Sequence, residues 1–381
     1  MVQRIKRTFW LKKISESWQK NNLIWLYGVR RVGKTYLCQS IPKVEYFDCE
    51  LPRIRRIFDD PEDFFSSVKS KKIIIDEIHR LSNPSEILKI AADYYPDIKI
   101  IATGSSTLGS SKKFRDTLTG RKKDLWLLPM IFQDLIDFNN TDLIYRLHRG
   151  GLPPFFLAKS YPEYEFQEWM DAFWAKDVAE LFHLERRYSF QKFMELIFSQ
   201  SGGIFEANSF ARPCEVSRST ISNYLKVLEA TIIVYIIRPF STYKQSEIVL
   251  APKAYAFDTG FVSYFKGWEK LRKEDLGLLW EHFVLNEIYA NFQTKKVYYW
   301  RDKRGHEVDF VMAARGRAPT AIETKWRVDN FDSKNLQAFR RIYQNGINYV
   351  VSYDVDKSFS RRYNNMKVKF VSLSNLIKEI V

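Results

Sequence analysis

A glycine-rich segment near the N-terminus has the residue types and spacing that bind a polyphosphate. The apolar run Leu23 to Tyr27 leads into the pattern Gly28-x-x-x-x-Gly33-Lys34-Thr35, which opens a helix. The glycines allow a tight turn whose backbone N–H groups point inward, and the helix N-terminus adds a partial positive charge. In this P-loop pattern the lysine reaches the β- and γ-phosphates, and the threonine hydroxyl binds Mg²⁺.

The segment therefore predicts a site for ATP and Mg²⁺, in which Lys34 also serves catalysis. A chance glycine-rich turn is the alternative. The predicted nucleotide contacts are Gly28, Val29, Arg30, Arg31, Val32, Gly33, Lys34, Thr35 and Tyr36. For Arg30 and Arg31 three interpretations stay open: contact with phosphate, contact with a neighbouring subunit, or exposure to solvent.

Two carboxylates follow an apolar, β-branched run. Ile73, Ile74 and Ile75 precede Asp76 and Glu77, and such a run is typical of a central parallel strand that is buried on both faces. In such sheets ligands bind at the carboxyl ends of the strands. This Walker B pattern predicts that Asp76 holds Mg²⁺ and that Glu77 orients and deprotonates the attacking water. Two solvated acids after a core strand are the alternative.

A further buried strand is predicted at Ile98 to Ala102, and Thr103, Gly104 and Ser105 follow it. A polar side chain at this strand end could hydrogen-bond the γ-phosphate or the attacking water. We favour Ser105 as the catalytic residue, with Thr103 second. An ordinary turn is the alternative for each.

The composition describes a folded, basic chain. Hydrophobic residues make up 45% of the 381 residues, which is enough to fill the cores of about two to four compact units. The net charge of +15 indicates a polyanionic partner, with nucleic acid favoured, although solubility explains part of the excess. The three cysteines form no CxxC pair, which fits a reducing, cytoplasmic location. No apolar run is long enough to span a bilayer, so no membrane partner is expected.

The motifs of the first third resemble those of the AAA+ superfamily ATPases. The resemblance rests on GVRRVGKT, IIIDE and IATGSS, and on the Gly120-Arg121 pair that precedes LLPMIFQDL. It is to a group of predicted bacterial and archaeal ATPases that carry a further C-terminal region. The resemblance implies an α/β fold with a parallel five-stranded sheet and a small helical lid. It also implies that copies of the chain assemble through the ATPase domain.

The same resemblance implies a catalytic role for Arg121. A guanidinium at this position would act as an arginine finger that reaches a neighbouring subunit and neutralises charge on the γ-phosphate in the transition state. A surface arginine is the equally weighted alternative, and Arg115 is the second candidate for the finger. The lid is expected to end in AKDVAEL, where Asp177 is expected to be a structural partner.

The middle of the chain resembles a winged helix-turn-helix. Three helices are predicted at 190–200, 205–211 and 216–229, and a β-ribbon at 232–238 and 255–258. Ser217 is a typical N-cap, and Ile221, Leu225 and Leu228 form the apolar stripe of the third helix. The residues expected to face DNA are Arg218, Ser219, Ser222, Asn223 and Lys226. A winged helix used only for packing is the alternative.

The last third resembles the PD-(D/E)xK nuclease core, with a helix, three strands, a helix and a strand predicted between 276 and 353. The resemblance implies that Asp309 and Glu323 bind Mg²⁺ and that Glu281 adds a carboxylate. It implies that Lys325 positions or activates water for phosphodiester hydrolysis. An even register would place Asp309, Glu323 and Lys325 on one face of the hairpin. No proline precedes Asp309, so cleavage and a fold kept only for binding both stay open.

These patterns predict four domains: an AAA+ core at 1–130, a helical lid at 131–189, a winged helix-turn-helix at 190–265, and an α/β restriction-endonuclease-like domain at 266–381. The predicted protein is an AAA+ ATPase that couples ATP binding and hydrolysis to action on DNA. The alternative is an ATP-dependent switch or scaffold whose nuclease-like domain is inactive and binds DNA or a protein.

Overall fold

The computed structural model describes residues 5–104, 108–109, 111–179, 182, 184, 186–242, 251–294, 296–314 and 316–380. The chain divides into two compact units. The first contains Met1–Asp142, Gly151–Glu185 and Ala230–Ile233, and the second contains Leu143–Gly150, Arg186–Glu229 and Val234–Val381. The finer division into four domains stays a prediction.

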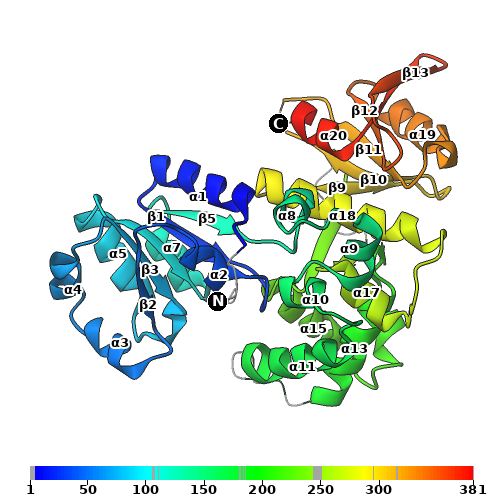
Figure 1. Ribbon diagram of the computed structural model, residues 1–381. Coiled ribbons are helices and arrows are strands. Elements are labelled where there is room, and N and C mark those ends of the chain that lie inside the picture. The colour runs from blue at the N-terminus through cyan, green and yellow to red at the C-terminus, as the bar shows by residue number, and fades with distance from the viewer. Residues whose placement is uncertain are drawn as a thin grey trace. The chain divides into compact units, whose positions relative to one another are not determined.

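The first unit is built on a five-stranded parallel sheet (Figure 1). Its strands, in spatial order, are β2 (Glu45–Asp48), β3 (Lys72–Asp76), β4 (Lys99–Thr103), β1 (Leu23–Tyr27) and β5 (Lys122–Trp126). The three isoleucines of β3 are fully buried, as expected for a β-branched run in a central strand. The predicted α/β core with five parallel strands is confirmed.

Helices join these strands and supply the rest of the core. They are α1 (Thr8–Lys20), α2 (Lys34–Gln39), α3 (Pro52–Ile57), α4 (Pro61–Ser67), η1 (Ile78–Arg80), α5 (Pro84–Tyr94), α7 (Lys112–Leu118), α8 (Phe132–Asp137), α10 (Pro153–Phe156), α11 (Glu163–Phe173) and the π-helical segment η2 (Trp174–Ala179). Phe114 of α7 packs on Trp25 of β1, with ring centroids 4.9 Å apart. The sequence patterns predicted no helix at α7, because its apolar positions are too few to show a period.

The second unit contains a nine-stranded mixed sheet. Its strands, in spatial order, are β13 (Phe359–Tyr363), β14 (Met366–Val371), β12 (Asn348–Ser352), β11 (Thr320–Lys325), β10 (Glu307–Met312), β9 (Tyr298–Arg301), β7 (Val234–Pro239), β8 (Lys253–Ala256) and β6 (Gly203–Ile204). Its helices are α9 (Leu143–Arg149), α13 (Arg187–Ser199), α14 (Ala207–Ala211), α15 (Arg218–Ala230), α17 (Thr259–Phe265), α18 (Asp275–Phe292), η3 (Val328–Asn330), α19 (Lys334–Ile342) and α20 (Leu373–Ile380). The predicted order from α18 to β12 is present, and β13, β14 and α20 extend it.

The two strands predicted as a β-ribbon belong to this large sheet. β7 and β8 pair antiparallel, as expected, but β7 also pairs with β9 and β8 with β6. All four residues of β8 are buried. The hairpin is thus an interior part of a sheet, and the winged helix-turn-helix stays a prediction.

Helix α15 has one buried face and one polar face. Ser217 caps it, because its Oγ accepts a hydrogen bond from the Thr220 amide at 3.1 Å. The buried positions are Ile221, Tyr224, Val227 and Leu228, whereas Leu225 is only half-buried. Because the helix turns 100° per residue, this stripe is rotated from the expected one by part of a turn. Within the described residues, no helix has the length and hydropathy needed to cross a membrane.

Candidate functional site

The P-loop is shaped by two glycines at the end of β1. A Cβ atom at Gly28 would lie 2.4 Å from the carbonyl oxygen of Leu127, so only glycine fits there. Gly33 has a φ of +99° and forms the N-cap of α2, a conformation that glycine adopts without steric cost. The loop therefore ends at a helix N-terminus with a bend that directs backbone N–H groups toward one point.

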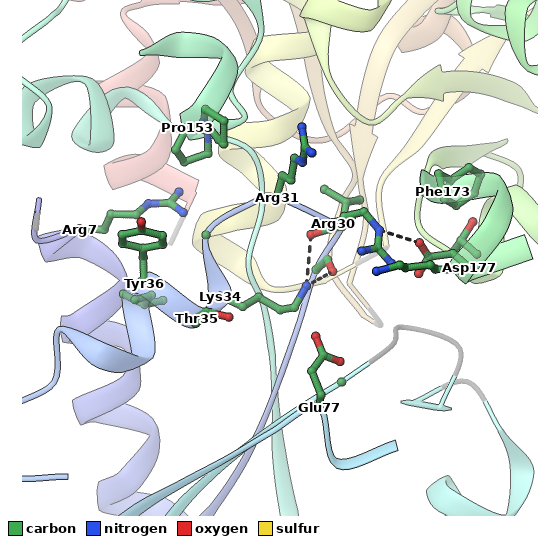
Figure 2. A pocket seen from close by; sticks show the side chains of 18 of the residues that line it. Arg7, Arg30, Arg31, Lys34, Thr35, Tyr36, Glu77, Pro153, Phe173 and Asp177 are labelled. Atoms are coloured by element: carbon green, nitrogen blue, oxygen red, sulfur yellow. Dashed lines mark hydrogen bonds and ion pairs between the residues drawn. The ribbon is translucent and has the colours of Figure 1, made fainter. Parts of the chain in front are cut away.

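The side chain of Lys34 folds back over this loop. Its Nζ donates hydrogen bonds to the carbonyl oxygens of Gly28, at 2.8 Å, and Val29, at 3.2 Å (Figure 2). Burial lowers the pKa of Lys34, and the carboxylate of Glu77 is the largest opposing influence. The ammonium group is thus held where a polyphosphate would lie, and the donor set fits that ligand.

Asp76, the last residue of β3, is the centre of a hydroxyl cluster. Its carboxylate accepts a hydrogen bond from Thr35 Oγ1 at 3.0 Å, and further ones from the hydroxyls of Tyr46 and Thr103. A threonine hydroxyl beside a carboxylate is the oxygen pair that P-loop enzymes use for Mg²⁺. Among the residues that the structure describes, no three His, Cys, Asp or Glu side chains gather into a metal cluster. The oxygen pair therefore fits an ion that takes its remaining ligands from phosphate and water.

Glu77 follows Asp76 in the left-handed region, with a φ of 52°. Its amide donates to Thr103 Oγ1 at 3.2 Å, and its Oε2 lies 3.1 Å from His79 Nδ1. Burial raises the pKa of Glu77, but the hydrogen bond with His79 and the charge of Lys34 outweigh it, so the pKa lies below its usual range. Figure 2 shows the carboxylate pointing toward the Lys34 ammonium. Glu77 is therefore ionised at neutral pH and placed to accept a proton.

A cavity of about 660 Å³ opens beside these groups. Its polar lining includes Arg30, Lys34, Thr35, Glu77 and Asp177, and its apolar lining includes Ile5, Tyr36, Phe138, Pro153, Leu157 and Phe173. The combination suits a nucleotide, because phosphates need cations and backbone donors whereas a base needs apolar faces. Asp177, expected to be a structural partner, pairs with Arg30 at this cavity.

Arg7 holds the far end of the P-loop. Its Nη1 donates to the carbonyl oxygen of Val32 at 2.9 Å, and its guanidinium makes two hydrogen bonds to Asp134, at 2.8 and 2.6 Å. The side chains of Arg7 and Asp134 are 4% and 0% exposed. No local sequence pattern indicated Arg7, since its partners are far along the chain. Tyr46 was missed for the same reason.

The structure bears differently on two other predicted catalytic residues. Ser105 lies outside the described residues, whereas Thr103, the second candidate, contacts both Asp76 and Glu77. Arg121 does not line the cavity of its own chain; its Nε donates to Asp93 Oδ1 at 2.7 Å. A role in a neighbouring copy stays a prediction.

The second unit brings the four C-terminal candidates together. Glu281, Asp309 and Lys325 line one cavity of about 280 Å³. Lys325 Nζ lies 2.9 Å from Glu323 Oε2 and 3.8 Å from Asp309 Oδ2. The register that pairs Phe310 with Ile322 places Asp309 opposite Glu323 when extended by one residue. These groups therefore share one site, as the even register predicts.

Charge in this second site is only partly balanced. Glu323 is 1% exposed, and its Oε1 has no hydrogen-bond partner among the residues that the structure describes. Burial, and then the charge of Asp309, raise its pKa to about 8, although Lys325 opposes this. An orphaned, buried carboxylate oxygen beside a second carboxylate fits a divalent cation. Binding of Mg²⁺ by Asp309 and Glu323 stays a prediction.

A lysine that sequence patterns missed borders this site. Lys253 of β8 contacts Glu307 and lies 3.4 Å from Glu281 Oε1. Burial lowers its pKa, but Glu281 and Asp309 outweigh burial and raise the pKa above its usual range. Tyr255 also donates to Glu281. Lys253 and Tyr255 of β8 therefore both contact Glu281, the carboxylate predicted on the helix. β8 corresponds to a strand expected to form the wing.

The residues expected to face DNA lie on α15. Arg218, Ser219, Asn223 and Lys226 are exposed and Ser222 is half-buried. Ser222 Oγ donates to the Arg218 carbonyl oxygen of the same helix, and Ser219 Oγ lies 2.7 Å from Oγ of the N-cap Ser217. They form a polar face, and its ligand stays a prediction.

Three family models match consecutive parts of the chain. Residues 20–136 match a model described as an AAA domain. Residues 140–272 and 276–375 match models that are each described as a domain of unknown function, DUF8612 and DUF4143.

Similar proteins include two relatives by sequence. The uncharacterized protein Rv2008c of Mycobacterium tuberculosis is 27% identical over 315 residues, which cover 80% of this chain and 70% of the relative. The uncharacterized protein MJ1544 of Methanocaldococcus jannaschii is 25% identical over 333 residues, with 77% and 72% covered. Among solved structures, the Walker-type ATPase PABY2304 of Pyrococcus abyssi is 15% identical with a TM-score of 0.45, covering 69% of this chain and 96% of that one.

The P-loop, the Asp76–Glu77 pair and the match over residues 20–136 agree with one another. Together they support ATP binding by an AAA-type ATPase domain at residues 20–136.

Proposed function

We propose that the chain hydrolyses ATP with Mg²⁺ and couples this reaction to the binding or processing of DNA. The observation that carries the proposal is the gathering of Lys34, Thr35, Asp76 and Glu77 around one cavity at the carboxyl ends of β1 and β3. In this proposal, the second unit binds or processes the DNA.

Each residue of the nucleotide site has a separate task. Lys34 leaves the carbonyl oxygens of Gly28 and Val29 and neutralises the β- and γ-phosphates. Glu77 orients the attacking water and accepts its proton; its lowered pKa keeps the carboxylate ionised, so it can take up a proton, but makes it a weaker base. Thr35 and Asp76 hold Mg²⁺, which when bound neutralises charge on the phosphate oxygens.

Three features support a DNA-directed second unit. The net charge of the chain is +15, the outer face of α15 is polar and basic, and Asp309, Glu323 and Lys325 share one site. For cleavage, Asp309 and Glu323 would hold Mg²⁺, and Lys325 would position the attacking water. Glu281 lines the same cavity, where Tyr255 and Lys253 contact it.

A second candidate function is an ATP-dependent switch whose second unit binds DNA or a protein without cutting. One observation favours it: Asp309 Oδ2 already accepts hydrogen bonds from the Thr324 amide, at 2.7 Å, and hydroxyl, at 2.9 Å. Lys325 likewise pairs with Glu323 Oε2 at 2.9 Å, so one oxygen of each carboxylate is satisfied by the chain itself without an ion.

The deciding experiment is phosphate release from ATP, measured with and without DNA. We expect turnover by wild type that DNA stimulates, and loss of turnover in Glu77→Gln, with Glu62→Gln of α4 as the exposed carboxylate control. Unchanged turnover in Glu77→Gln would overturn the catalytic assignment. Cleavage of DNA with Mg²⁺ that Asp309→Ala abolishes would select the nuclease, and binding without cleavage of any DNA form would select the switch.

We further propose that copies assemble through the ATPase domain and that Arg121 completes a neighbouring nucleotide site. The Arg121–Asp93 pair is partly exposed, so its exchange for an external phosphate costs little. Sedimentation of wild type with ATP should show an oligomer. Mixing Arg121→Ala with Glu77→Gln should then restore some turnover, since each copy supplies what the other lacks; no restoration would exclude Arg121 as the finger.

A further inference from the structure

Two aromatic residues stand at the carboxyl ends of neighbouring parallel strands in the second unit. β11 and β12 pair in a register that places Lys325 beside Ser352, and the next residues are Trp326 and Tyr353. Their rings are stacked, with centroids 4.2 Å apart and planes within 6° of parallel. The sequence patterns did not indicate this pair, because the two residues are distant along the chain.

A third ring supports the stack from one side. Trp280 of α18 approaches Trp326 and Tyr353 edge-on, with centroids 5.9 and 6.0 Å away. Its Nε1 donates to the carbonyl oxygen of Val351 at 3.1 Å, and the ring is 2% exposed. The stacked pair is therefore fixed in orientation by a buried anchor.

The stack itself is not buried. Tyr353 is 48% exposed, and Trp326 is half-buried. Trp326 lines the same cavity as Glu281, Asp309 and Lys325. Core packing explains Trp280, but it does not explain why two partly exposed rings are stacked beside a charged cavity.

The neighbouring charges indicate what the rings would hold. Lys273 of this cavity and Arg327, next to Trp326, are exposed cations suited to phosphate, whereas Lys325 is paired with Glu323 and Asp309. A planar apolar surface beside exposed cations suits a nucleobase joined to a phosphate. In a duplex both faces of each base are already covered by its neighbours, so a protein ring stacks well only on an unpaired base.

We propose that Trp326 and Tyr353 form a shelf that stacks an unpaired base of single-stranded DNA beside the Asp309–Glu323–Lys325 site. The proposal rests on the proposed function only in that DNA is the ligand. It names the substrate class of that site: a single strand or a frayed end rather than an intact duplex.

The test is fluorescence anisotropy of labelled DNA with the full chain in EDTA, so that no strand is cut. Wild type should bind a single strand more tightly than a duplex of the same sequence. Tyr353→Ala should weaken single-strand binding by about tenfold, given what one stacked base contributes, and should leave duplex binding unchanged. Tyr353→Phe, which keeps the ring, should bind like wild type.

Two controls separate stacking from charge and from folding. Tyr188→Ala removes another exposed ring of the second unit, 71% exposed on α13, and should have no effect. A strand with abasic sites keeps its phosphates but lacks bases, and it should bind wild type as weakly as the normal strand binds Tyr353→Ala.

The possible failures are distinguishable. If wild type binds DNA but Tyr353→Ala weakens neither form, or weakens both equally, the shelf is wrong and the proposed function stands. If wild type binds no DNA at all, the DNA-directed part of the proposed function is wrong and the shelf is wrong with it.

Discussion

Arg30 of the P-loop and Asp177 of η2 form an ion pair, with Arg30 Nε 3.0 Å from Asp177 Oδ2. The next loop residue, Arg31, pairs with Glu168 of α11 at 2.8 Å, and Trp169 Nε1 donates to the Arg30 carbonyl oxygen at 3.1 Å. Two ion pairs and one hydrogen bond thus link the P-loop to the segment α11–η2. A π-helical turn often marks a functional position.

This pair predicts that Asp177→Asn tightens ATP binding. Asp177 lines the nucleotide cavity beside Lys34, so its negative charge opposes a polyphosphate and competes with it for Arg30. Removing the charge should lower the Kd for ATP by about fivefold, which corresponds to roughly 1 kcal/mol, and the Kd for ADP by less. Calorimetric titration measures both. Glu168→Gln is the matched control, since Glu168 does not line the cavity, and weaker binding by Asp177→Asn would mean that the ion pair itself is required.

Thr103→Val should impair both stability and turnover. The Thr103 hydroxyl donates to Asp76 and accepts the Glu77 amide hydrogen bond, and the residue is fully buried. Loss of the hydroxyl leaves buried polar groups unpaired, at a cost of about 1–3 kcal/mol. Urea unfolding and phosphate release measure the two effects. Thr103→Ser keeps the hydroxyl and should retain turnover; equal loss in both variants would show that the hydroxyl alone does not account for the effect.

Arg7→Met should lower the free energy of unfolding by about 3 kcal/mol or more, because Asp134 would remain buried without its charged partner. The variant also loses the hydrogen bond to the Val32 carbonyl oxygen, so ATP should bind more weakly. Denaturant unfolding and ATP titration are the measurements. Adding Asp134→Leu should recover part of the stability but not the ATP affinity. Recovery of both stability and ATP affinity would show that the bond from Arg7 to the P-loop is not needed for ATP binding.

Gly28→Ala should disturb the P-loop through the backbone. The added Cβ would lie 2.4 Å from the Leu127 carbonyl oxygen, so the loop must move, at a cost of about 1–3 kcal/mol, and ATP affinity should fall. Gly277→Ala is the control: nothing lies within 4 Å of its Cβ, and alanine favours a helix by about 1 kcal/mol over glycine. A Gly28→Ala protein with normal stability and affinity would contradict the close contact.

Glu323 should make stability fall as pH rises. Its pKa is about 8 in the folded chain against an ordinary value of 4.5, so between these values the native state holds a proton that the unfolded state has released. The contribution is complete below pH 4.5 and is lost as the pH rises through 8. Its slope is at most about 1.4 kcal/mol per pH unit. Denaturant unfolding across this range should show a smaller slope for Glu323→Gln, and parallel curves would mean that its pKa is not raised.

Several parts of the fold and of the first site could be predicted from sequence because the residues that carry them are contiguous. Gly28 to Thr35 define a turn and the helix after it, and Ile73 to Glu77 define a strand and its carboxyl end. Parallel β strands then bring both ends to one edge, which places Lys34, Thr35, Asp76 and Glu77 together. The five-stranded sheet follows from the same alternation of apolar runs and helices.

The rest was decided by tertiary packing. Arg7 and Asp134 are 127 residues apart, and Lys253 reaches Glu281 only because β8, the expected wing strand, is buried inside a larger sheet. The α15 stripe likewise shifted from Leu225 toward Tyr224. Local patterns fix which residues form a strand, a helix or a turn, because those depend on neighbours in the chain. They do not fix which distant side chains meet, since that depends on how strands are ordered and how large side chains fill the space between them.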